Sequence, residues 1–142
     1  MTVRFLVAAM LAGASSIALA APPAYLMVDQ SSAALMDKAA AQAAWQAEMP
    51  AKLTKRLFKL YPPARWGFIT QVEGGFTQGK ACVVTARAML VPRAGKVLQF
   101  VPNKAATAFD SLPGATQDKC RDLAKAKLDE AITAVLSSLV KT

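Results

Sequence analysis

The sequence predicts an α+β fold. Helix-forming segments come first, the middle of the chain alternates apolar and polar side chains as strands do, and a long segment with one apolar stripe comes last. Two cysteines stand in the predicted sheet and the predicted last helix. We therefore expect amino-terminal helices, a three-stranded antiparallel β-meander, and a carboxy-terminal helix packed on the sheet and tied to it by one disulfide.

The first 20 residues have the pattern of a secretory signal peptide. Arg4 precedes an apolar run that begins at Phe5, and Ala18-Leu19-Ala20 supplies a cleavage site. No cysteine follows that site directly, and no second apolar segment reaches the roughly 20 residues that a membrane span needs. We expect cleavage after Ala20 and a soluble periplasmic or secreted product.

The rest of the chain is predicted to be a single α+β domain, residues 21–142. We expect it to be mainly helical over 21–60, a β-meander over 64–102 and a helix over 116–141. Without Arg4, 16 of the 17 basic residues remain against 9 acidic ones, a net charge of +7. Such a surface attracts anionic partners.

The first predicted helix runs from Ser31 to Met49 and is rich in alanine, the best helix former. Asp29, Ser31 and Ser32 are candidate caps at its start, and Pro50 marks its end. Pro50 can also open a second helix that reaches Tyr61.

This second helix is predicted to be basic and amphipathic, with leucines opposite the cations. No acidic residue occurs between Ala51 and Val72. The helix is either a solvated surface or a site for an anionic membrane or an acidic partner. The candidate contact residues are Lys52, Lys55, Arg56, Lys59 and Arg65.

Three strands are predicted over residues 65–78, 79–93 and 95–102, separated by glycine and proline. Their short links favour antiparallel pairing. Alternation places one apolar set on the inner face: Trp66, Phe68, Val72, Cys82, Val84, Ala86, Ala88, Leu90, Leu98 and Phe100.

The opposite face of the predicted sheet also carries apolar residues, between polar ones. They are Ile69, Val83, Met89, Val97 and Val101. Either the amino-terminal helices cover this face or it is a docking surface for a partner or an apolar ligand. We expect coverage by the helices, because buried faces are the ordinary outcome.

The last helix has Thr116 as its cap and Asp118 in its first turn. Cys120 lies on its apolar stripe, and Cys82 lies on the inner strand face. In an oxidising compartment such a pair forms a structural disulfide. Closing this loop stabilises the fold by about 4 kcal/mol in the chain-entropy model.

Signals for catalysis are few. The chain has no histidine, which excludes imidazole bases and most zinc sites, and no metal site or cofactor motif is expected. Residues 74–82, GGFTQGKAC, approach the phosphate-loop pattern, but Ala81 stands where magnesium needs a hydroxyl and a strand follows instead of a helix. A β-hairpin turn is expected there, and no nucleotide.

The sequence therefore favours an exported, non-catalytic binding or inhibitor-like protein. Its expected partner is an anionic component of the cell envelope or an exported protein. Peripheral contact with a membrane surface is one such interaction. Nucleic acid is not expected as a partner. The alternatives are a carrier of an apolar ligand and a small hydrolase that uses carboxylates. The candidate carboxylates are Glu73, Asp110 and Asp118.

Overall fold

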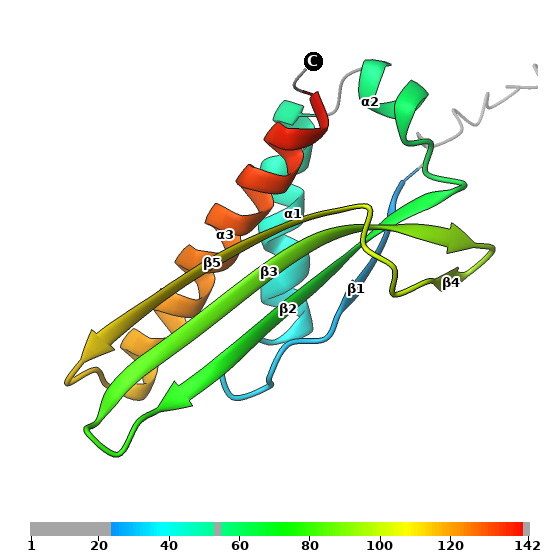
Figure 1. Cartoon of the computed structure of the whole chain (residues 1–142). Coiled ribbons are helices and arrows are strands. Elements are labelled where there is room, and N and C mark those ends of the chain that lie inside the picture. Colours follow the sequence, from blue (N-terminus) through cyan, green and yellow to red (C-terminus); the bar gives the residue numbers. More distant parts are fainter. Residues whose placement is uncertain (1–23, 53–54, 141–142) are drawn as a thin grey trace, which may run out of the picture.

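A curled sheet with two long helices against one face forms the body of the protein (Figure 1). The computed structural model describes residues 24–52 and 55–140, without the side chains of residues 50–52. The elements in chain order are β1 (Leu26–Asp29), α1 (Lys38–Lys52), α2 (Lys55–Leu60), β2 (Trp66–Phe76), β3 (Ala81–Ala94), β4 (Val97–Leu98), β5 (Lys104–Pro113) and α3 (Gln117–Val140).

The long strand β3 organises the sheet. It pairs antiparallel with β2 along one edge and with β5 along the other, and near its end it also pairs with β4. β1 pairs parallel with β2, so the sheet is mixed. The α+β class and the packing of the last helix on the sheet are confirmed, whereas the simple three-stranded meander is wrong.

The third strand was predicted in the wrong place. Within residues 95–102 only Val97 and Leu98 form a strand, and the long partner of β3 is β5. β5 turns Ala106 and Ala108 toward α3, and Ala108 is buried there. Because this inner face holds small side chains, β5 lacks the large alternating apolar residues that identify a strand in sequence.

The first helix begins later than predicted, at Lys38 instead of Ser31. The backbone N–H groups of Gln30 and Ser32 donate to carbonyls of β2, so this segment continues along the sheet edge. The carboxylate of Asp37 then caps α1 by accepting from the N–H of Ala40 at 2.7 Å.

The boundary predicted at Pro50 is also wrong, because α1 continues to Lys52. Proline removes one backbone donor and crowds the preceding turn. α1 continues for only two residues beyond Pro50, so the missing backbone donor lies close to the end of the helix. The basic segment forms the separate helix α2 over residues 55–60, two residues beyond the end of α1.

The core lies between the inner face of the sheet and the helices. Trp45 of α1 packs on Phe68 of β2 with ring centroids 4.6 Å apart, and Leu128 and Ile132 of α3 are fully buried. The predicted inner faces of β2 and β3 are correct, since Phe68, Val72 and the alternate residues from Cys82 to Leu90 are buried. α1 approaches the core through its alanines, including Ala41 and Ala44.

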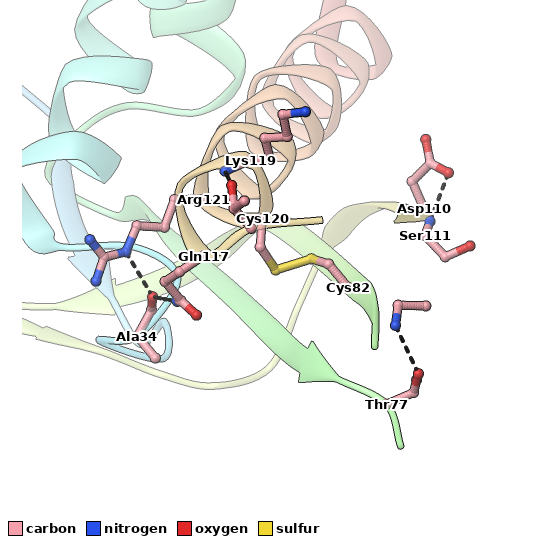
Figure 2. The surroundings of a disulfide bond; sticks show 11 residues. Ala34, Thr77, Cys82, Asp110, Ser111, Gln117, Lys119, Cys120 and Arg121 are labelled. Carbon is pink, nitrogen blue, oxygen red and sulfur yellow. Dashed lines mark hydrogen bonds between the residues drawn. A yellow bond between two sulfur atoms is a disulfide. The ribbon is translucent and has the colours of Figure 1, made fainter. Parts of the chain in front are cut away.

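The disulfide between Cys82 and Cys120 is confirmed (Figure 2). Both residues are fully buried, and the bond joins β3 to the first turn of α3. The hydroxyl of Thr116 accepts from the N–H of Lys119 at 3.3 Å, which confirms the predicted cap. Arg121 donates to the carbonyl of Ala34 and so ties α3 to the segment before α1.

The outer face of the sheet is largely uncovered, which contradicts the expected coverage. Figure 1 shows α1 and α3 on the same side of the sheet, because both pack on the inner apolar set. On the outer face, Leu98 packs against a small buried cluster of Ile69, Met89 and Val91. Farther along this face Phe109 is 79% exposed.

Among the described residues, no helix is both long and apolar enough to cross a membrane.

Candidate binding surface

The basic residues singled out from the sequence stand near the start of β2. Lys55, Arg56 and Lys59 are exposed on α2, and Arg65 is exposed just before β2. Leu57 is buried in the core, so this side of the short helix α2 faces inward. The side chain of the fifth predicted contact, Lys52, lies outside the described residues.

A second segment, residues 95–103, lies at the same end of the sheet. Trp66, the first residue of β2, is the register partner of Pro92, and β3 then continues into the β4 hairpin. Sequence reasoning placed residues 95–102 in the third strand of the meander and so missed the exposure of this segment. The available signal was an apolar run, VLQFV, enclosed by Gly95 and Pro102.

The side chain of Arg93 joins the two segments. Its guanidinium donates to the carbonyl of Pro63, at 3.0 Å, and to the carbonyl of Gly95 in the β4 turn. The N–H of Arg93 also donates to the carbonyl of Arg65, at 2.7 Å. The loop after α2 and the β4 hairpin are therefore held together.

Four large apolar side chains are exposed on these segments. Leu60 follows the basic face of α2, and the other three surround the β4 hairpin. Their exposed fractions lie between 50% and 66%, and they are Leu60, Val97, Phe100 and Val101. We call this surface the basic–apolar end; its exposed cations are Lys55, Arg56, Lys59, Arg65, Lys96 and Lys104.

The two sequence segments that build the basic–apolar end contain no acidic residue. None occurs from Ala51 to Val72, and none from Lys80 to Phe109. The acidic residues belong to other segments of the chain, for example Asp110, which lies 3.5 Å from Lys127 of α3. The charge is therefore unevenly distributed, and a basic region lies at the same end of the sheet as the exposed apolar side chains.

The chain also enters the fold at the basic–apolar end. Tyr25, directly before β1, donates from its hydroxyl to the carbonyl of Tyr61 at 2.6 Å. Its ring stacks on Phe58 of α2 with centroids 5.8 Å apart. The beginning of the described chain is thus packed against α2 and the loop that follows it.

Other parts of the described chain contain surface hollows. One, of about 290 Å³, lies between β1 and α1 beside Asp29, Lys38 and Trp45. The carboxylate of Asp29 accepts hydrogen bonds from the hydroxyls of Ser31 and Thr70, at 2.6 and 2.8 Å, so it holds β1 to the sheet edge. Another, of about 260 Å³, contains Asp37, the cap of α1.

The candidate carboxylates do not converge. Glu73 is the register partner of Thr85 and Asp110 that of Val84, so they project from opposite faces of the sheet. Asp110 and Glu130 both contact Lys127, and the Glu130 hydrogen bond raises the pKa of that lysine. Asp118 lies in the first turn of α3. Among the described residues, no group of three or more acidic or cysteine side chains is arranged to hold a metal ion.

No family model and no curated protein matches this chain.

Proposed function

We propose that this chain is an exported, non-catalytic binding protein that engages an anionic component of the cell envelope through its basic–apolar end. The observation that carries this proposal is that the cations of α2 and the exposed apolar side chains of the 95–103 segment lie at the same end of the sheet, where Arg93 joins the loop after α2 to the β4 hairpin. The buried disulfide between Cys82 and Cys120 agrees with an oxidising compartment.

The physical basis is that the two kinds of side chain act at different ranges. Clustered cations attract an anionic partner over about 10 Å at moderate ionic strength. Exposed apolar side chains act only on contact, where burying them contributes roughly 25 cal/mol for each Å² removed from water. A partner recognised here should therefore bind more weakly as salt rises, with a residual apolar contribution.

The hydrolase alternative has less support, because Glu73 and Asp110 lie on opposite faces of the sheet. The carrier alternative requires an apolar cavity between the sheet and the helices. That space is occupied by Trp45, Phe68 and Leu128, each at most 1% exposed. Both arguments favour a surface function.

The test compares two variants with the same change in charge. The end variant replaces four cations of the basic–apolar end by glutamine: Lys55, Lys59, Arg65 and Lys96. The control variant replaces four exposed lysines from other parts of the protein by glutamine: Lys38, Lys80, Lys119 and Lys125. Equal far-ultraviolet circular dichroism and equal unfolding midpoints establish that both are folded.

Each protein carries a photocrosslinker and is incubated with envelope extract, and captured proteins and lipids are identified by mass spectrometry. We expect the wild type and the control variant to capture the same anionic component and the end variant to lose it. If all three proteins capture the same components, or if the wild type captures none, the proposal is wrong.

A further inference from the structure

We propose that the anionic partner is the phospholipid surface of a membrane, and that residues 97–101 insert into it while α2 and Arg65 contact the headgroup phosphates. This inference rests on the proposed function and specifies its partner. Three observations carry it: the form of the 95–103 loop, the arrangement of its cations, and the position at which the chain enters the fold.

The 95–103 loop presents its apolar side chains on a fixed backbone. The N–H of Gln99 donates to the carbonyl of Pro92 at 2.9 Å, that of Val101 to Gln99 at 2.7 Å, and that of Asn103 to Leu90 at 2.9 Å. Leu98 anchors the loop from beneath, in the small outer cluster. Val97 and Phe100 are therefore exposed on a loop that is already ordered. Binding through them requires little additional loss of conformational entropy.

Cations flank this apolar segment on both sides in the sequence. Lys96 directly precedes Val97 in the turn, and Lys104 follows the loop at the start of β5. Long basic side chains can lay their methylene stems along apolar surface while the charged group stays at the level of the headgroups. Basic clusters next to apolar anchors bind anionic bilayers by this combination.

The place where the chain enters the fold favours a membrane over an acidic protein. Tyr25 is fixed to Tyr61 and Phe58, beside α2. Until it is cleaved after Ala20, the predicted signal segment holds the amino-terminal end of the chain at the membrane. The basic–apolar end, where the chain enters the fold, is therefore the part next to the membrane when the protein is released.

The experiment uses protein expressed from the full coding sequence and purified in the form that the cell accumulates. It is mixed with vesicles of phosphatidylglycerol and phosphatidylcholine, or of phosphatidylcholine alone, and the bound fraction is measured by flotation. We expect binding only to the anionic vesicles. Each cation near such a surface contributes about fivefold in affinity, so the loss of four cations should weaken binding by up to roughly 600-fold. The control variant should bind much closer to wild type.

Insertion is tested separately from adsorption. Phe100→Trp places a fluorophore at the apolar tip, and Phe109→Trp places one on the outer sheet face as the matched control. Brominated lipids quench a tryptophan that enters the acyl region. We expect strong additional quenching for the variant at residue 100 and none for the variant at residue 109. Phe100→Ser with Val101→Ser should reduce vesicle binding while the cations remain.

The outcomes separate the two proposals. Loss of vesicle binding in the end variant, together with quenching at residue 100, supports the membrane inference. If the wild type does not float with anionic vesicles but the end variant still loses a component of the envelope extract, the proposed function stands and the membrane inference is wrong. If vesicle binding is equal in the end and control variants, the inference is also wrong.

Discussion

Leu98 lies directly against Gly67, and this contact closes the β4 hairpin onto the outer face of the sheet. A Cβ atom placed on Gly67 would stand 2.5 Å from Cδ2 of Leu98 and 2.6 Å from the carbonyl oxygen of Leu26. Both distances are shorter than real carbon contacts allow. Residue 67 is therefore restricted to glycine by two neighbours, one a flexible side chain and the other the backbone of β1.

We predict that Gly67→Ala destabilises the protein by about 1–3 kcal/mol, the usual range for overpacking. Urea unfolding followed by circular dichroism measures the change. Adding Leu98→Ala should restore only part of the loss, since the carbonyl of Leu26 cannot move away without disturbing the β1 pairing. Complete restoration would show that the backbone contact carries no cost.

The clamp at Arg93 gives a second prediction. Arg93→Met keeps much of the side-chain length but removes the donors to Pro63 and Gly95, so the 95–103 loop should lose order. We expect faster hydrogen exchange at the amides of Gln99 and Val101, with a loss of about 1 kcal/mol in global stability.

The matched control for this clamp is Arg87→Met. Arg87 is exposed on the outer face, where its Nε lies 3.4 Å from the hydroxyl of Thr107. This variant should leave exchange at the 95–103 loop unchanged. Equal exchange rates at Gln99 in the wild type and in Arg93→Met would contradict the clamp.

The disulfide gives a third prediction. Its loop has a sequence separation of 38, so replacing Cys82 and Cys120 together by alanine should lower the free energy of unfolding by about 4 kcal/mol. Chemical denaturation of the double variant tests this value. Reduced wild-type protein should unfold at a similar midpoint, and a midpoint equal to that of the oxidised protein would exclude a stabilising role.

The buried hydroxyl of Tyr25 gives a prediction about pH. Burial raises the pKa of Tyr25 to about 12, from an ordinary value of 10.0. The folded state therefore holds this proton more tightly than the unfolded state, and its stabilising effect is complete below pH 10 and is lost as the pH rises toward 12. Stability should fall across that interval.

Tyr25→Phe tests the assignment, because it removes the titrating group together with the hydrogen bond to Tyr61. We expect a loss of about 1 kcal/mol at neutral pH and a flatter dependence of stability on alkaline pH. Tyr61→Phe is the control, because it keeps the backbone carbonyl that Tyr25 uses. If both variants retain the wild-type alkaline profile, Tyr25 is not responsible for it.

The parts of the fold that could be predicted carry large side chains in a regular period. The inner faces around Phe68 and Val84, the final helix and the pairing of Cys82 with Cys120 all follow from such patterns. β5 could not be recognised, because its inner positions are alanines that lie beneath α3. β1 is only four residues long, and its partner is distant in sequence.

Only the basic part of the candidate binding surface was predicted from the sequence. The absence of acidic residues around Lys55 and Lys59 identified the basic helix from sequence alone. The apolar partner of that helix was hidden, because Val97, Phe100 and Val101 fit strand alternation as well as an exposed loop. The tertiary bonds of Arg93 that join the two segments cannot be read from the sequence.

The last helix completes the inner face of the sheet and carries the second cysteine, and this governs when the chain can fold. Phe68, Val84 and Leu90 lack their full cover until residues 117–140 are available. A nascent chain that has not yet delivered this segment cannot finish its core or close its crosslink. The folded state therefore becomes available only after nearly all of the polypeptide has been synthesised.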